Sequence, residues 1–208
     1  TLFRSQWKEY GENVWGLTAS DGPQNTTQEY RGEQRQFRHY SSRGAGLREN
    51  FDDGTIPPTA AIASVVFAPE QVIPATLEMH KRFGDYIYSS YGFLDSFNPS
   101  FNYDIPIKTG RLVPDRGWVA SDYIAIDQGP ILTMIANYRD DFVWEVMKKN
   151  PYIRKGLERA GFSGGWLAPE GSFQPLELQK DEKAAAARAV GIAESRAAAA
   201  QEQKNNAN

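Results

Sequence analysis

The sequence contains no cysteine, which excludes a disulfide framework and a thiolate metal site. It has only two histidines, His39 and His80, so a histidine-rich metal centre is also excluded, and we expect neither a metal nor a cofactor. No apolar run reaches the length of a membrane-spanning helix, so we expect no membrane span. The net charge is -3 and no basic stripe stands out, which argues against nucleic acid as a partner.

Several catalytic signatures are missing as well. There is no glycine-rich phosphate loop, nucleophile elbow, zinc-protease motif or internal repeat. The 208 residues suffice for one domain with a sizeable core, which we place over residues 1–177. Residues 178–208 are rich in alanine and charge but lack a large apolar stripe, so we predict an appended tail. The abrupt opening, TLFRSQWKEYG, is interpreted as the middle of a longer sequence.

Aromatic side chains are frequent in the loop-like sequence between Gly84 and Tyr123. They lie among Gly, Pro, Asn and Ser without sustained helical spacing: Tyr86, Tyr88, Tyr91, Phe93, Phe97, Phe101, Tyr103, Trp118 and Tyr123. Such side chains either pack a loop onto the core or offer flat faces to a ligand, and sugar rings stack on such faces. We expect most of them to pack and two or three to meet a ligand.

Residues 121–162 carry the clearest helical periodicity. An extended stretch over 124–126 leads to Pro130, which suits the first turn of a helix because its missing N–H costs nothing there. Apolar residues then recur every three or four positions and predict one long helix with a single apolar stripe. The stripe consists of Ile131, Ile135, Tyr138, Phe142 and Val146. Pro151 predicts a break before a further helix over 152–160.

Asp127 lies just before this predicted helix. An aspartate there faces unpaired backbone N–H groups and the positive end of the helix dipole, and both favour the ionised carboxylate. It is therefore either a helix cap or a carboxylate that is kept ionised to act as a base. The residue type at one position does not separate these two roles.

The segments before residue 121 are mainly predicted from turn and helix signals. Residues 24–51 are polar and rich in Gly and Arg, so we predict a long irregular loop. Thr59 can cap a short apolar helix over 60–66. Pro69 begins a helix that Gly84 ends. Its predicted buried face holds Ile73, Leu77 and His80. Glycine and proline residues over 109–118 predict a hairpin-like segment.

A tight glycine-bracketed loop follows Trp15 and contains Thr18, Ser20 and Asp21. Polar side chains so close to a tryptophan suit a loop that faces a ligand, although such residues also form turns without any function. The chain thus predicts a mostly helical body whose loops carry carboxylates and aromatic rings. Those residue types are what a cleft that cleaves glycosides requires.

Several short motifs occur in order along the chain. They are WGLTASDGP at 15–23, DGTI at 53–56, PTAA at 58–61, FAPE at 67–70, YGF at 91–93, Asp95 with Phe97-Asn98, IDQGP at 126–130 and NYR at 137–139. In these motifs and their spacing, residues 1 to about 162 resemble the glycoamylase-like family. This family of α/α-toroid proteins includes endo-β-1,2-glucanases and the C-terminal domains of cyclic β-1,2-glucan synthases.

The resemblance implies the C-terminal half of an (α/α)6 toroid-type glycoside hydrolase, mostly α-helical with long irregular loops. Family members have a comparable stretch of helices before the WGLTASDGP motif, including the segment with the acid glutamate. This chain has no such segment. We therefore expect as a partner an N-terminal half of the barrel on another chain, or a second copy of this chain.

The resemblance also implies roles for individual residues. Asp127 matches the general base, and no metal ligand is implied. The implied substrate-binding residues are Trp15, Asp21, Asp53, Asp95, Tyr91 and Phe93. Glu70 also matches a cleft-side position but is better explained as a first-turn helix residue.

The expected function is hydrolysis of a β-glucan, an oligo- or polysaccharide with β-1,2 links, by an inverting mechanism. Two alternatives stay open: a carbohydrate-binding or accessory module without catalysis, and a glucan transglycosylase. The expected location is periplasmic or secreted, with the cytoplasm as the alternative.

Overall fold

The computed structural model describes residues 10–44 and 51–168. The chain divides into two compact units, Thr1–Tyr138 and Arg139–Asn208. The predicted boundary between residues 177 and 178, and the tail beyond it, lie outside the described residues.

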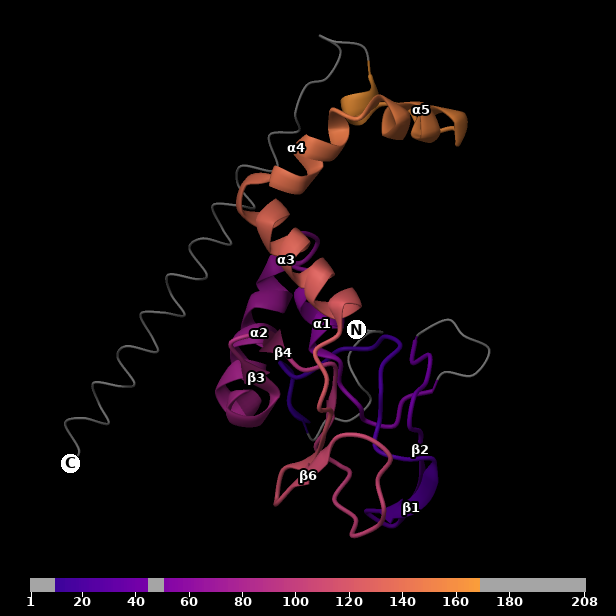
Figure 1. The fold of residues 1–208 in the computed structure, drawn as a ribbon, viewed down its shortest axis with the longest axis vertical. Coiled ribbons are helices and arrows are strands. Elements are labelled where there is room, and N and C mark those ends of the chain that lie inside the picture. Colours follow the sequence, from indigo (N-terminus) through magenta and orange to yellow (C-terminus); the bar gives the residue numbers. More distant parts are fainter. Residues whose placement is uncertain (1–9, 45–50, 169–208) are drawn as a thin grey trace, which may run out of the picture. The chain divides into compact units, whose positions relative to one another are not determined.

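Helices provide most of the regular structure in the described part, and short strands accompany them (Figure 1). The elements up to the end of the first unit are β1 (Thr26–Tyr30), β2 (Glu33–Phe37), α1 (Pro58–Ile62), α2 (Pro69–Ile87), β3 (Tyr88–Ser89), β4 (Gly92–Phe93), β5 (Phe97–Asn98), β6 (Arg111–Val113), β7 (Gly117–Val119) and α3 (Ala125–Asp140). The second unit contains α4 (Phe142–Lys148), α5 (Pro151–Arg159) and the 3-10 turn η2 (Gly165–Leu167).

Helix α2 begins as predicted at Pro69, where a proline costs no hydrogen bond. Its buried side chains recur every three or four residues, which gives one face toward the core: Val72, Ala75, Met79, Phe83 and Ile87. The predicted face was wrong, because Leu77 and His80 lie on the exposed side. The helix also continues past Gly84 to Ile87, since the apolar face extends for another turn.

The strands form three small antiparallel sheets with no large sheet among the described residues. Strands β1 and β2 pair as a hairpin from Thr26–Phe37 to Tyr30–Glu33, so the prediction of an irregular loop over 24–51 was wrong. The hairpin turn is Arg31-Gly32, in which both residues have positive φ. The predicted excursion over 109–118 is confirmed as the β6–β7 hairpin, to which β5 adds on the other side of β7.

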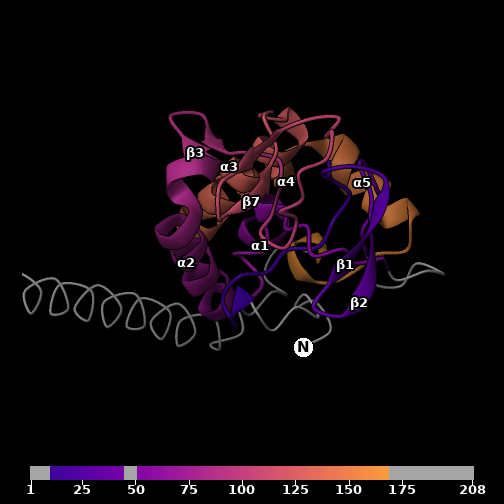
Figure 2. The ribbon, with the colours of Figure 1, turned by 90° about the horizontal axis from the view of Figure 1, so that it is seen from below.

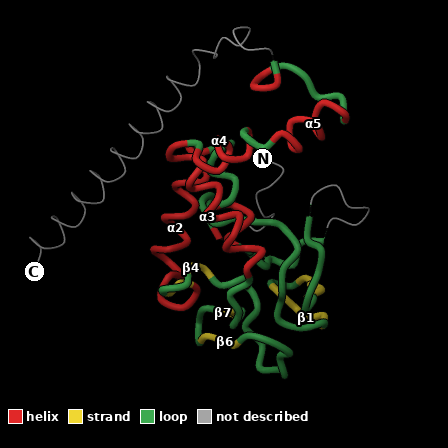
Figure 3. Tube along the Cα trace, turned by 45° about the horizontal axis from the view of Figure 1, so that its top comes forward, coloured by secondary structure: helices red, strands yellow, loops and turns green. Residues whose placement is uncertain are grey.

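The first unit has two apolar clusters. The larger joins α1, α2, the strands β4 and β5 and the start of α3, and it includes Ile62, Met79, Phe97 and Ile131. The smaller gathers Phe37, Phe101, Trp118 and Ala120. In Figure 2, α2 and the β1–β2 hairpin lie on opposite sides of this unit, and Figure 3 shows α2 and α3 apart from β1.

The segment predicted as one helix over 131–146 is two helices. Asp141 adopts the left-handed conformation, with φ of 58°, and this separates α3 from α4. Of the predicted stripe, Ile131 is buried, whereas Phe142 and Val146 are exposed. The prediction also began the helix too late, because α3 starts at Ala125 rather than at Pro130.

The second unit confirms the predicted break at Pro151, which begins α5 after Asn150 caps it with its side chain. Arg154 ties α5 to the following turn by donating to the backbone oxygens of Trp166 and Leu167, at 2.7 and 3.1 Å. Within the described ranges, every helix is too short or too polar to cross a membrane.

Candidate active site

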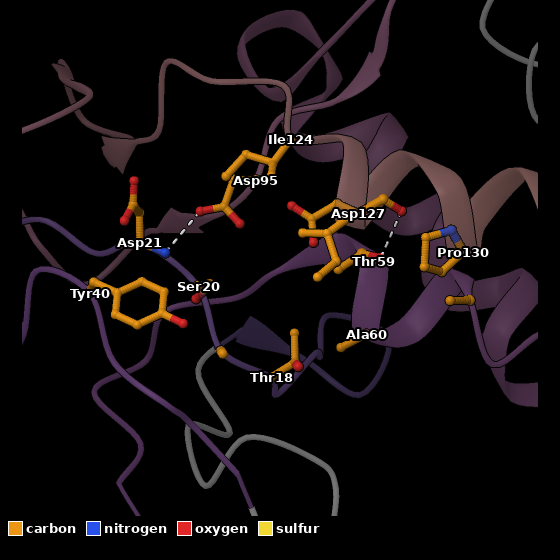
Figure 4. A pocket seen from close by; sticks show the side chains of 13 residues that line it. Thr18, Ser20, Asp21, Tyr40, Thr59, Ala60, Asp95, Ile124, Asp127 and Pro130 are labelled. Atoms are coloured by element: carbon orange, nitrogen blue, oxygen red, sulfur yellow. Dashed lines mark hydrogen bonds between the residues drawn. The ribbon is translucent and has the colours of Figure 1, made fainter.

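A pocket of about 420 Å³ opens where the loop over residues 18–21, helix α1 and the start of α3 meet (Figure 4). Its lining combines carboxyl and hydroxyl groups with small apolar side chains. The lining residues are Thr18, Ala19, Ser20, Asp21, Tyr40, Thr59, Ala60, Ala63, Asp95, Ile124, Ile126, Asp127 and Pro130. Three of the sequence-predicted site residues, Asp21, Asp95 and Asp127, are thus brought together.

Asp127 is the third residue of α3, in its first turn, and not before the helix as predicted. Its backbone carbonyl accepts a hydrogen bond of 3.0 Å from Oγ1 of Thr59, which fixes α3 against α1. The side chain is only 6% exposed, and its Oδ2 atom has no hydrogen-bond partner among the described residues. The carboxyl group of Asp127 also takes part in hydrogen bonding with Asp95.

The pKa of Asp127 shifts in the direction opposite to the one that its position at a helix start predicts. Burial raises the pKa of Asp127, and hydrogen bonding and charge repulsion from Asp95 raise it further, to about 7 from the ordinary 3.8. A helix N-terminus favours a carboxylate by about 0.3–1 kcal/mol. One pKa unit already corresponds to about 1.4 kcal/mol, so burial and the neighbouring carboxyl outweigh the helix dipole here.

Asp95 lies between β4 and β5 and faces Asp127 across the pocket wall (Figure 4). Its Oδ2 accepts from the backbone N–H of Asp21 at 2.9 Å and from Oγ of Ser96 at 3.1 Å. Burial raises the pKa of Asp95, and the charge of Asp21 adds to this. The hydrogen bonds from the Asp21 backbone, Asp127 and Ser96 oppose the rise. The two carboxyl groups therefore titrate as a pair, not singly.

Asp53 does not line the pocket. It is fully buried and forms an ion pair with Arg43, with 3.0 Å between Nη2 and Oδ2. Burial alone would raise the pKa of Asp53, but the hydrogen bonds and charge of Arg43, with help from Thr55 and Arg38, bring it below the ordinary value. The geometry gives this carboxylate a structural partner and no access to a ligand.

The three predicted aromatic site residues also lie outside the pocket lining. Trp15 is half-buried and packs against the larger core cluster, and Phe93 belongs to that cluster. Tyr91 is 75% exposed and contacts the ring of Tyr123, with 5.7 Å between centroids. Glu70 is an exposed residue in the first turn of α2, as its alternative interpretation stated.

Sequence reasoning missed several residues that shape the pocket. Thr59 was predicted as a helix cap but lies inside α1 and donates to Asp127. Tyr40 lines the pocket from a stretch predicted as irregular loop, and Arg43 of the same stretch is buried. No local sequence pattern predicts the roles of Arg43 and Thr59, because their hydrogen-bond partners are ten and about seventy positions away in the sequence. Within the described residues, no group of three His, Cys, Asp or Glu side chains could hold a metal ion.

The sequence profile of the Glycoamylase family, described as "Putative glucoamylase", matches residues 3–151. The chain belongs to this family. Among curated proteins, it is 29% identical over 150 residues to the exo β-1,2-glucooligosaccharide sophorohydrolase (non-reducing end) of Parabacteroides distasonis. That alignment covers 72% of this chain and 16% of the relative, so the chain spans about a sixth of the relative's length.

Two solved structures of the glycoamylase type resemble the fold. The endo-β-1,2-glucanase from Chitinophaga pinensis, in complex with sophorotriose and glucose, matches with 30% identity and a TM-score of 0.57. A "putative glucoamylase" from Bacteroides uniformis matches with 35% identity and a TM-score of 0.56. Each match covers 78% of this chain, but only 31% and 32% of those structures, respectively.

Proposed function

We propose that this chain is part of a glycoside hydrolase that cleaves β-1,2-glucan with inversion, and that Asp127 is its general base. The observation that carries the proposal is the buried Asp127 carboxyl, which lines the pocket and has a pKa raised to about 7. A general base works best when its pKa lies near the operating pH. Asp127 meets this condition because burial and Asp95 raise its pKa.

The substrate class rests on the relatives and on the lining of the pocket. The names of the matched hydrolases specify β-1,2-linked glucose chains. A volume of about 420 Å³ falls in the range of small-molecule sites, about 300–1,000 Å³. We assign Asp21 and Asp95 to sugar hydroxyl groups, since their carboxyl oxygens are acceptors at the pocket wall.

We assign the general acid to a residue outside this chain. An inverting site separates its acid and base by about 6.5–9.5 Å so that a water molecule fits between base and sugar. Asp95 and Asp127 are within hydrogen-bonding reach of each other, so they form one unit on one side of the bond. We therefore assign the acid to a glutamate of the N-terminal helices of an (α/α)6 toroid, on another chain or segment.

Exposed apolar side chains in the first unit support the idea that further helices cover it. Ile126 and Leu132 on α3 are 78% and 68% exposed, and Phe67 before α2 is also exposed. Helical proteins bury such side chains against neighbouring layers. In the proposed toroid, the missing helices would pack here and bring the acid glutamate to the pocket.

The test is incubation of the full-length protein with linear β-1,2-glucan. New reducing ends are expected, and proton NMR should show the α-anomer first, because inversion of a β-linkage gives the α-product. A β-anomer appearing first would contradict inversion. Glucan transfer without a rise in reducing ends would indicate a transglycosylase. Calorimetric binding of the glucan without any reaction would indicate an accessory module instead.

A further inference from the structure

A line of hydrogen bonds runs from the buried Arg43 to the pocket carboxyl of Asp95. The guanidinium group of Arg43 forms a two-pronged pair with Asp53, in which Nε and Nη2 each lie 3.0 Å from a carboxylate oxygen. Both side chains are fully buried. Two parallel bonds fix the plane of the guanidinium group as well as its position.

The remaining N–H groups of Arg43 bind the loop that lines the pocket. Nη1 donates to the backbone oxygen of Ser20 at 2.6 Å and lies 3.4 Å from that of Asp21. Nη2 also donates to the backbone oxygen of Arg38 at 3.0 Å. The loop approaches so closely that a Cβ atom at Gly22 would lie 2.1 Å from the same Arg38 oxygen. The backbone at residues 20–22 is thus held from one side by the guanidinium group.

This loop and Ser96 converge on a single oxygen of Asp95. The N–H of Asp21 and the hydroxyl of Ser96 both reach Oδ2, at 2.9 and 3.1 Å. The Ser96 hydroxyl also lies 2.9 Å from the backbone oxygen of Asp21, so its single proton is shared between that oxygen and the Asp95 carboxyl. Ser96 is fully buried.

Asp95 and Asp127 therefore differ in the number of hydrogen-bond donors that their carboxyl groups have. Oδ2 of Asp95 has two donors, whereas Oδ2 of Asp127 has none among the described residues. Donors stabilise a carboxylate in its ionised form. The charge that acts on Asp95 is that of Asp21, which is acidic and raises the pKa, whereas hydrogen bonds from the Asp21 N–H, Asp127 and Ser96 lower it, so donors and not cations favour the ionised form.

We propose that Ser96 and Arg43 are positioning residues that hold Asp95 as the ionised member of the pair and so leave the shared proton on Asp127. Ser96 acts directly through its hydroxyl, and Arg43 acts through the loop that presents the Asp21 N–H. This deepens the proposed function and rests on it, because it decides which carboxyl has to lose its proton before Asp127 can serve as a base.

The test is the replacement Ser96→Ala in the full-length protein, followed by carbon-13 NMR titration of the aspartate carboxyl carbons. In the wild type, the titration step near neutral pH should be carried mainly by the Asp127 carbon. In Ser96→Ala, Asp95 loses a hydrogen-bond donor. The fraction of the chemical-shift change near neutral pH that appears at the Asp95 carboxyl carbon should therefore rise several-fold. The matched control is Ser100→Ala, which removes another buried hydroxyl, bonded to Asn98, and should leave the shares of the Asp95 and Asp127 carbons unchanged.

The inference would be overturned if Ser96→Ala, with its fold intact by circular dichroism, left the titration step distributed between the Asp95 and Asp127 carbons as in the wild type. An equal effect of Ser100→Ala would overturn it as well. Arg43→Lys keeps the charge but loses the two-pronged geometry, and a folded variant should shift the division in the same direction. If Arg43→Lys does not fold, Ser96→Ala still decides. The NMR readout needs no turnover, so it remains decisive even if the protein does not cleave β-1,2-glucan.

Discussion

At the scale of single residues, burial determines the chemistry of this site more than position along the helix does. The grouping of Asp21, Asp95 and Asp127 at one candidate site could be predicted from the sequence, because motifs fix residue types and spacing. The protonation of Asp127 could not, since it depends on desolvation and on Asp95, which lies 32 positions earlier in the numbering of the chain. Asp53 illustrates the same limit, because its partner Arg43 lies in a stretch without a helical or strand pattern.

Asp127 should also make stability depend on pH. Its pKa is raised in the folded state, so it stabilises the fold fully below about pH 3.8, and this contribution is lost as the pH rises toward about 7. We expect Asp127→Asn to remove this loss, so the variant should gain melting temperature over the wild type by a few degrees more at pH 8 than at pH 4. Thermal melts across this range provide the measurement. A constant difference between the two proteins would contradict the raised pKa.

At the scale of elements, predictions held where local chemistry decides the structure. Pro69 and Pro151 begin helices, as prolines at first positions do, and the β6–β7 hairpin follows its turn residues. Predictions failed where a turn used an unusual residue in the left-handed region. Arg31 in the β1–β2 turn and Asp141 between α3 and α4 both have positive φ, which an arginine does not suggest and an aspartate permits without requiring it.

The contact between α1 and α3 should matter for the site. Thr59→Val keeps the shape of the side chain but removes the hydrogen bond to the Asp127 carbonyl, at a cost of about 1 kcal/mol. We expect a loss of this size in chemical denaturation together with a several-fold fall in glucan cleavage. Thr76→Val is the control, since its hydroxyl bonds within α2 and its loss should leave cleavage unchanged. Equal activity losses in both variants would argue against a role of this contact in the site.

At the scale of the whole molecule, the family resemblance is confirmed, and the order of its motifs was readable from the sequence. The (α/α)6 toroid is a proposal that rests on the family resemblance, because the helices of the described residues do not form a closed ring. The exposed Ile126 and Leu132 lead to a prediction: the 208-residue chain made alone should self-associate or bind a hydrophobic dye, whereas the full-length protein should not. Light scattering and dye fluorescence test this. A monodisperse monomer that binds no dye would contradict the proposed architecture.

The central claim is that Asp127 is the base of a glucan-cleaving site, and the most direct test is the pH dependence of kcat/KM on linear β-1,2-glucan. A base has to be ionised, so the wild-type rate should rise with pH through about 7, the pKa of Asp127. Asp127→Asn should lower kcat/KM by about 10²- to 10⁴-fold, the usual contribution of a general base. Asp104→Asn, at an exposed position outside the pocket, should leave it unchanged. A folded Asp127→Asn variant that keeps the wild-type rate and its pH profile would contradict the account.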